Sequence, residues 1–268
     1  MALSANASKF FLYENTVQNP EWHVRYPSQF HRRLVGKSPL KFREDFCGSG
    51  KISCEWVKVS KRHYATGIDA NAMVLRYAND TNKEVLSEHQ QARLAFWQKD
   101  VAHVSREKFD IIGAYNFSIF EFHERKNLLR YFKSVFKSLA NPGTFFCDVA
   151  GGSGFLRTRQ RIQNLEILGI GKVQQVWEQM DYDPISATNK YAIHFMLPNG
   201  SCFNKAFKYH WRIWQIKEVR EILKEAGFKK SVVIWERDTD DRYGSGQSYL
   251  AEKAENAYSW VAYVVGIK

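Results

Sequence analysis

The sequence predicts an α/β protein with a central, mostly parallel sheet of seven strands and helices on both faces. Three observations lead to this fold class. Between residues 40 and 150, short strand-like segments alternate with segments whose apolar residues recur at helical spacing. Segments of alternating polar and apolar residues follow, as in antiparallel strands, and two further strand segments lie near the end. Alternating strands and helices imply βαβ units, whose right-handed crossovers give a parallel sheet.

The first part of the chain supplies five of these strands and three helices. The expected strands are Lys41–Phe46, Tyr64–Asp69, Arg93–Trp97, Phe109–Ala114 and Thr144–Val149. The expected helices are Ile52–Val59, Ala72–Leu86 and Leu128–Leu139. Ligands of parallel sheets bind beyond the carboxyl ends of the strands, so the residues just after each strand matter most.

After Gly154 the pattern changes to antiparallel strands, expected at Val173–Asp181, Tyr191–Leu197 and Ser201–Trp214. The last two flank Pro198-Asn199-Gly200, a strong turn signal, so we expect a β insertion after the fifth strand. A helix over Ile216–Ala226 and strands over Val232–Glu236 and Trp260–Ile267 complete the pattern, with glycine-rich Tyr243–Gln247 in a loop.

Two regions are expected. Residues 1–39 are irregular and punctuated by prolines, and they are interpreted as short helices that form an N-terminal cap. Residues 40–268 are interpreted as one domain that carries a β-hairpin insertion at about 170–214.

Composition restricts the class of protein. The 268 residues carry a formal net charge of +11, which favours encounter with anions, but the basic residues are scattered, which weakens a nucleic-acid interpretation. No stretch is long and apolar enough for a membrane span, and Met1–Phe11 lacks the pattern of a secretory signal. The four cysteines lack paired metal-ligand spacing, so no metal is expected. These features together predict the reducing cytoplasm.

Acidic residues stand at the ends of three successive strands. Glu44 opens the segment Glu44–Gly50, which follows a strand and precedes a helix, where small residues let a ligand approach the backbone. Asp69 ends the next strand and can accept hydrogen bonds from ribose hydroxyls. Asp100 follows the third strand, placed for an adenine amine. Singly each acid suits a turn or a cap, but together they indicate an adenosine-containing ligand.

These residues resemble the successive motifs of class I S-adenosylmethionine-dependent methyltransferases, a Rossmann-like fold. The resemblance spans roughly residues 40–150 and includes Gly67-Ile68-Asp69, Gln98-Lys99-Asp100 and Ala114–Ser118. More narrowly, Arg43–Gly48 (Arg-Glu-Asp-Phe-Cys-Gly) and Trp211–Trp214 (Trp-Arg-x-Trp) resemble an uncharacterised bacterial and plant subgroup.

The resemblance implies S-adenosylmethionine as cofactor, S-adenosylhomocysteine as product, and a set of contacts. Glu44 would hold the methionine amino group, Asp69 the ribose and Asp100 the adenine amine, while Asn116 and Phe117 would lie under the sulfonium. Arg43 is a partner for the methionine carboxylate by charge alone. The full expected cofactor site is Arg43, Glu44, Phe46, Cys47, Gly48, Gly50, Asp69, Ala70, Asp100, Val101, Asn116 and Phe117.

One residue departs from the family pattern. Phe46 occupies the position of the first glycine, which narrows the approach to the backbone there. A pyrophosphate would need that approach and S-adenosylmethionine has no phosphate, so Phe46 disfavours a nicotinamide dehydrogenase.

The acceptor is expected where the cap, the loop after the fourth strand and the insertion converge. Its expected contacts are Tyr13, Phe120, Tyr209, Trp211 and Arg212, with His123 and His210 nearby; packing or a rim salt bridge would equally explain several of them. No catalytic residue is assigned, because methyl transfer depends largely on proximity and orientation. A small or medium-sized acceptor is the leading hypothesis. RNA or protein methylation, and a non-catalytic binder of S-adenosylmethionine, remain alternatives.

Overall fold

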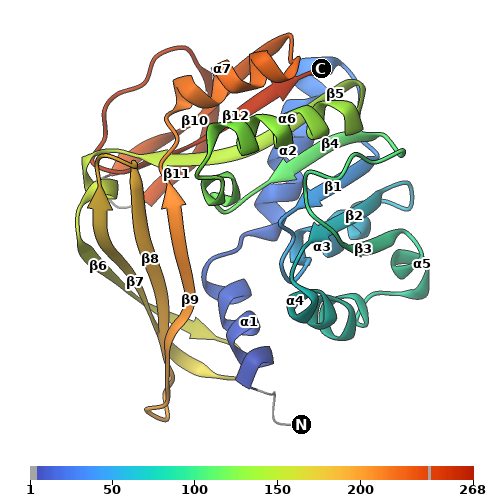
Figure 1. The fold of residues 1–268 in the computed structure, drawn as a ribbon. Helices are drawn as coiled ribbons and strands as arrows, with labels where there is room; N and C mark the ends of the chain where they lie inside the picture. Colours follow the sequence, from blue (N-terminus) through green and yellow to red (C-terminus); the bar gives the residue numbers. More distant parts are fainter. Residues whose placement is uncertain (1–4, 241–242) are drawn as a thin grey trace.

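The computed structural model describes residues 5–240 and 243–268, and a mixed eight-stranded sheet forms its centre (Figure 1). The strand order is β11-β10-β12-β5-β4-β1-β2-β3. The bounds are β1 (Lys41–Asp45), β2 (Tyr64–Asp69), β3 (Leu94–Gln98), β4 (Phe109–Ala114), β5 (Leu139–Gly151), β10 (Lys230–Asp240), β11 (Tyr243–Ala251) and β12 (Trp260–Ile267). Strands β1 to β5 pair in parallel, and β12, β10 and β11 are antiparallel to their neighbours. The predicted mostly parallel sheet is therefore confirmed.

The sheet has one strand more than the sequence predicts. Strand β11 contains the glycine-rich Tyr243–Gln247, which was expected in a loop, and it pairs with β10 at the edge of the sheet. Its residues Tyr-Gly-Ser-Gly-Gln-Ser give no apolar alternation, so backbone pairing forms a strand that the sequence pattern does not reveal.

Helices cover both faces of the sheet (Figure 1). Their bounds are α2 (Pro20–Val35), α3 (Lys51–Val59), α4 (Ala72–Tyr77) with the π-helical turn η1 (Ala78–Lys83), α5 (Glu88–Gln91), α6 (Arg125–Ser138) and α7 (Ile216–Ala226). Two apolar clusters result. Phe132 of α6 and Leu223 of α7 belong to one, and Trp56 of α3 and Phe30 of α2 to the other. Helix α2 is thus a layer of the main domain, although it falls in the segment expected to be a cap.

The insertion forms a second, antiparallel sheet in the order β6-β7-β8-β9. Its strands are β6 (Arg159–Ile167), β7 (Gly171–Asp183), β8 (Thr188–Met196) and β9 (Cys202–Arg212). The antiparallel insertion is as predicted, and the hairpin of β8 and β9 has the expected turn. The sheet begins earlier than the expected residue 170, because β6 is largely polar and exposed and carries little apolar pattern.

Helix α1 (Ala5–Thr16) lies between the second sheet and α4 (Figure 1). The Phe10 ring lies 5.3 Å from that of Tyr77 on α4 and 6.2 Å from that of Phe207 on β9. Leu12 is fully buried in a cluster with Ile193 and Phe195 of β8. Helix α1 therefore joins the two sheets on one side of the molecule.

The N-terminal segment Met1–Phe11, which was not expected to be a secretory signal, begins with four residues outside the described part of the chain. From Ala5 onward it belongs to α1. Across residues 5–240 and 243–268, no helix has the length and apolar character needed to cross a membrane.

Two glycines of the turn after β1 provide a test of how this fold packs. Gly48 and Gly50 share left-handed backbone, with φ of 54° and 69°, but differ in their surroundings. A Cβ on Gly48 would meet no atom within 4 Å, whereas one on Gly50 would lie 2.2 Å from the Phe96 ring.

We expect Gly48→Ala to lower the free energy of unfolding by about 1 kcal/mol, and Gly50→Ala by roughly 2–4 kcal/mol. Urea unfolding measures both values. Phe96→Leu should restore part of the stability of Gly50→Ala only, and equal losses would contradict the packing role.

Candidate cofactor and acceptor site

The turn after β1 is held against the end of β2. The Gly48 N–H donates to Asp69 Oδ2 (2.9 Å), and the Cys47 N–H donates to the Ile68 carbonyl (3.0 Å). Asp69 Oδ1 accepts from the Asn71 N–H (2.9 Å), so the carboxylate fixes the turns after both strands. Asp69 is half-buried and each oxygen keeps a further lone pair, so it can still accept hydrogen bonds from a ligand. Ala70 follows it in an exposed position.

Glu44 of β1 connects the strand before this turn to the helix after it. Its Oε2 accepts hydrogen bonds from the Ser53 N–H (2.9 Å) and hydroxyl (2.5 Å), in the first turn of α3. Burial raises the pKa of Glu44 to about 8, although these hydrogen bonds oppose the rise, and the nearby charges of Asp69 and Asp45 add to it. Glu44 therefore caps the helix that follows the glycine turn.

Phe46 is accommodated at the glycine position by packing. Its φ is 56°, in the left-handed region that costs a residue with a Cβ about 1–2 kcal/mol. Its ring packs edge-on against Phe122 and Tyr131, with centroids 5.9 and 5.8 Å away. The phenyl group therefore contacts the α6 side of the sheet, and these contacts offset the backbone strain.

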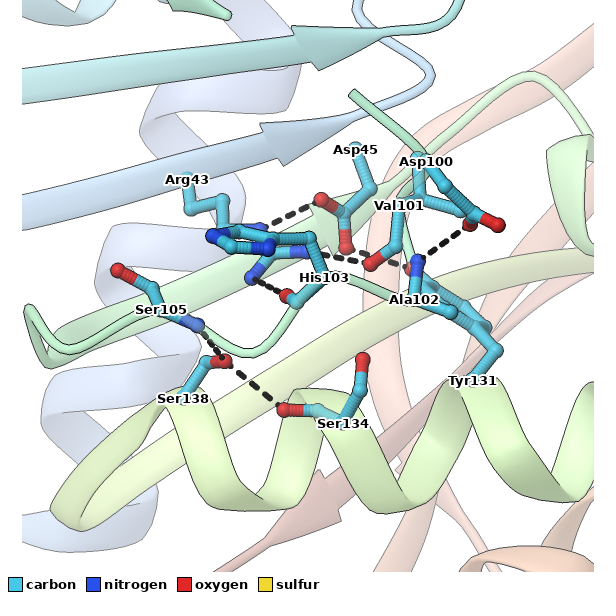
Figure 2. A network of polar contacts seen from close by, with 10 residues as sticks. All are labelled: Arg43, Asp45, Asp100, Val101, Ala102, His103, Ser105, Tyr131, Ser134 and Ser138. Carbon is cyan, nitrogen blue, oxygen red and sulfur yellow. Dashed lines mark hydrogen bonds and ion pairs between the residues drawn. The ribbon is translucent and has the colours of Figure 1, made fainter.

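Arg43 lies under the loop after β3 (Figure 2). Its side chain is fully buried and pairs with Asp45 (Nε to Oδ1, 2.6 Å), which also accepts from the Tyr131 hydroxyl (2.8 Å). Its other nitrogens donate to the carbonyls of Val101 (2.6 Å) and His103 (3.2 Å). This burial does not suit the expected contact with a methionine carboxylate. Arg43 instead fixes the loop expected to bind adenine.

That loop presents Asp100 to solvent. Asp100 is exposed, and its Oδ1 accepts from the Ala102 N–H (2.8 Å), so it closes a turn as well as standing at the expected adenine position. Val101 is buried in the core with the α6 and α7 side chains.

The loop after β4 is held by a residue that the sequence does not single out. Asn116 and Phe117 have left-handed φ values of 58° and 60°. Their N–H groups donate to the two carboxylate oxygens of Asp148 on β5, at 2.9 and 2.8 Å. Asp148 is buried, and burial raises its pKa to about 7 against the effect of those hydrogen bonds. Its one sequence signal is a lone acid within an otherwise apolar strand, which alone does not indicate a function.

Aromatic side chains gather beside this loop. The Phe117 ring lies 5.8 Å from that of Trp211, and Trp211 lies 4.5 Å from Tyr209 on the same face of β9. Trp177 of β7 lies 6.1 Å from Tyr209 and 5.9 Å from Trp211. Tyr13 of α1 packs against the same apolar cluster as Trp177 and Tyr209, and it lies near enough to Tyr209 to raise the pKa of that residue further than burial alone. Three of the five expected acceptor contacts, Tyr13, Tyr209 and Trp211, are therefore brought together next to Phe117.

The other two expected contacts lie elsewhere. Phe120 is fully buried in the core behind Phe117 and Trp211. Arg212 points to the opposite face of β9 from Trp211, since neighbouring strand residues alternate. It stacks on Trp214 at 3.7 Å, donates to the His123 carbonyl (2.8 Å) and lies 3.7 Å from Glu218. Arg212 thus makes the rim salt bridge, and His123 and His210 contact each other beside it.

Two further residues of this region escape the sequence analysis. Glu121 accepts a hydrogen bond from Trp211 Nε1 (2.7 Å), and Trp177 extends the aromatic group. Neither belongs to a motif, and only the pairing of β7 with β8 and the turn after β4 bring them to this place.

No protein-family model matches the sequence, and a search of the curated proteins gives no match. Among solved structures, an S-adenosylmethionine-dependent methyltransferase from Clostridium acetobutylicum is similar to this chain, with 16% identity and a TM-score of 0.66. The similarity covers 98% of this chain and 99% of that chain. The sugar N-methyltransferase KedS8 from Streptoalloteichus has 14% identity and a TM-score of 0.67, over 100% of this chain and 94% of that chain. S-adenosylmethionine-bound CalS10, an amino pentose methyltransferase from Micromonospora echinaspora, has 11% identity and a TM-score of 0.67, over 99% of this chain and 98% of that chain.

The chain therefore has the class I methyltransferase fold. The similarity in fold extends over nearly the whole length of the chain.

Two buried carboxyls of the site predict an unusual pH dependence of stability. Glu44 and Asp148 keep their protons to a higher pH in the folded chain, where burial raises their pKa values to about 8 and about 7, than in the unfolded chain, where both lie near 4. The folded chain therefore binds more protons between about pH 4 and pH 8. We expect the free energy of unfolding to fall as pH rises through this window, by on the order of 3 kcal/mol per group.

Urea unfolding at successive pH values measures this slope. Asp148→Asn and Glu44→Gln should each flatten it, and Asp181→Asn, at an exposed carboxylate of β7, should not. Equal slopes in all variants would contradict the pKa assignments.

Arg43 predicts a local effect on the loop after β3. Arg43→Lys keeps a positive charge but cannot reach Asp45 and both carbonyls at once. We expect a loss of about 3 kcal/mol in stability and faster hydrogen exchange of residues 100–105, measured by mass spectrometry. Lys41→Ala, at an exposed position of the same strand, is the control. Unchanged exchange in that loop would remove Arg43 from its positioning role.

Proposed function

We propose that the chain is an S-adenosylmethionine-dependent methyltransferase that acts on a small or medium-sized acceptor. The observation that carries the proposal is a cluster of acids at the carboxyl edge of the sheet, where Glu44, Asp45 and Asp69 lie near enough to act on one another's pKa or on that of Cys47. Asp45 is paired with Arg43, which leaves Asp69 as the half-buried acid of this edge, and a carboxylate there suits a sulfonium cation and opposes the pyrophosphate of a dinucleotide.

The residues present fit the cofactor. A Cβ at Gly48 would meet nothing within 4 Å, which leaves room for a ligand against the backbone. Asp69 has acceptor capacity for ribose hydroxyls, and Asp100 is exposed at the adenine position. Asn116 and Phe117 are held in place by Asp148 to lie under the methyl donor. Glu44, Cys47, Gly50, Ala70 and Val101 complete the proposed site.

When bound, S-adenosylmethionine supplies a methyl carbon that forms a bond to the acceptor's lone pair while its bond to sulfur breaks towards sulfur. The chain's own part is to hold the acceptor in line and to exclude water. The region between α1, β9 and the loop after β4 is suited to this, because Tyr13, Tyr209 and Phe117 are half-buried there. The similar structures include a sugar N-methyltransferase and an amino pentose methyltransferase, which supports a small acceptor.

An RNA or protein acceptor has one observation in its favour. A groove along α6 is lined by Lys126, Arg130, Lys133 and Lys137, and that helix carries no acidic residue. The groove lies on a helix that covers a face of the sheet, whereas the aromatic group stands beside the carboxyl edge. We therefore place the small acceptor first. A non-catalytic binder would share the cofactor site but give no turnover.

The finer assignments are part of this proposal. They are membership of the bacterial and plant subgroup with the Arg-Glu-Asp-Phe-Cys-Gly motif, and a cytoplasmic location. All four cysteines are free thiols and three of them, Cys47, Cys54 and Cys147, are buried, as expected in a reducing compartment.

Calorimetric titration tests the cofactor assignment. We expect S-adenosylmethionine and S-adenosylhomocysteine to bind with dissociation constants on the order of micromolar, and NAD not to bind. Asp69→Ala should weaken binding by roughly 1–3 kcal/mol, because hydrogen bonds to a charged group are lost. Asp80→Ala, at an exposed carboxylate, should bind as the parent does. Absence of binding by either sulfur ligand would overturn the proposal.

A further inference from the structure

The group formed by Phe117, Trp177, Tyr209 and Trp211, here called the aromatic group, has the composition of a site for a cation. Its members come from the loop after β4 and from β7 and β9. Trp177, Tyr209 and Phe117 are half-buried, so part of each ring surface remains accessible, while Trp211 is packed behind them. The faces of Trp and Tyr rings attract ammonium groups through their quadrupoles.

One acidic side chain, Glu121, is in direct contact with this group. Glu121 is exposed and accepts a hydrogen bond from Trp211 Nε1 through Oε1 (2.7 Å). Burial raises the pKa of Tyr209, and the negative charge of Glu121 adds to that rise. Burial likewise raises the pKa of Tyr13 to about 12, with a contribution from the charge of Asp148. Burial is thus the main cause of both pKa shifts, and the acidic side chains Glu121 and Asp148 add to them.

Nearby positive groups are directed elsewhere. Arg212 belongs to the opposite face of β9, where it stacks on Trp214. Lys9 of α1 donates to the Ala206 carbonyl (3.2 Å) and lies over the rings of Phe10 and Phe207.

We propose that the methyl acceptor of this site is an amine, held against the aromatic group with Glu121 facing its nitrogen. The inference rests on the proposed methyltransferase function and gives it a substrate class. It depends on the contact between Glu121 and Trp211 together with the accessible rings of Trp177 and Tyr209.

The direction in which charge develops distinguishes nitrogen from oxygen acceptors. A neutral amine, having lost one proton to water, forms the bond to the methyl carbon with its lone pair as the carbon–sulfur bond breaks. The nitrogen becomes a methylated ammonium and the sulfur a neutral thioether, so the positive charge moves from sulfur to nitrogen. Glu121 and the ring faces stabilise that charge as it develops. An oxygen nucleophile would react through its anion, which the Glu121 carboxylate would repel.

Choline and its neutral isostere 3,3-dimethylbutan-1-ol are the probes that test this site, because choline matches the product-like cation and neither needs turnover. Binding to the full chain is measured by saturation-transfer NMR and calorimetry. We expect choline to bind at least about ten times more tightly than the alcohol, which corresponds to about 1.4 kcal/mol. Equal affinities for the two probes would overturn the proposal.

Matched variants test whether choline binds at Glu121 and the aromatic group. Glu121→Gln should weaken choline binding about fivefold to tenfold and leave S-adenosylhomocysteine binding within twofold. Glu124→Gln removes the same charge from an exposed position three residues away and should leave both unchanged. Trp177→Leu, at a half-buried ring, is the second variant and should also weaken choline binding. Choline affinity that is insensitive to Glu121→Gln and Trp177→Leu would overturn the assignment.

The outcome is separable from that of the proposed function. Binding of S-adenosylmethionine without preference for choline would leave a methyltransferase with a different acceptor class. Preference for choline without binding of either sulfur ligand would leave a cation site and overturn the methyltransferase proposal. With a labelled methyl donor and a small-molecule extract, the label should appear in N-methyl carbons, and label in O-methyl carbons alone would overturn the amine assignment.

Discussion

Carboxyl side chains on parallel strands hold the turns after β1, β2 and β4 of the candidate site. Glu44 on β1 accepts from Ser53 in α3, Asp69 on β2 accepts from Gly48 and Asn71, and Asp148 on β5 accepts from Asn116 and Phe117. In each case one side chain satisfies two donors that a strand-to-helix turn leaves without sheet partners. The loops can therefore take left-handed conformations and still be fixed. These six hydrogen bonds therefore fix the backbone of the turns that border the site.

Burying these acidic side chains costs free energy, because a charged carboxylate loses its hydration, but the acids also attract a cation. Glu44 and Asp148 are almost fully buried, and their raised pKa values show that the charged forms are disfavoured there. An apolar strand end would avoid the cost of burying an acid but would leave the turn N–H groups unsatisfied, which is also destabilising. A bound cation would relieve the repulsion among the acids, so a sulfonium would be attracted by the same groups that shape its site. Arg43 offsets part of the charge at Asp45, and the side chains of both residues are fully buried.

The sequence predicts those parts of the molecule that depend on local pattern. Strands β2, β4 and β12 and helix α7 begin and end where the apolar pattern places them. The carboxylate–turn contact of Asp69 also follows from the order strand, glycine turn, helix, strand. The second sheet is only partly predictable, since β6 is polar and β11 is glycine-rich, and both are strands because a neighbour offers its edge. Arg43 shows the limit of reasoning from charge: a side chain inside a strand points into the core or out of it, and here it points inward.

The acceptor region could not be predicted to the same depth, because its members are far apart in the chain. Tyr13, Phe117, Trp177 and Tyr209 come together through three separate long-range arrangements. These are α1 across the two sheets, β7 paired with β8, and the loop held by Asp148. Strand alternation alone leaves open which of Tyr209, His210, Trp211 and Arg212 face the site. The pairing of β9 with β8 decides it, placing Tyr209 and Trp211 on one face and Arg212 on the other. The turns proposed to bind the cofactor are thus encoded locally, in short motifs at the ends of consecutive strands. The acceptor half depends on how two sheets and one helix meet, so acceptor specificity can change while the cofactor motifs stay the same.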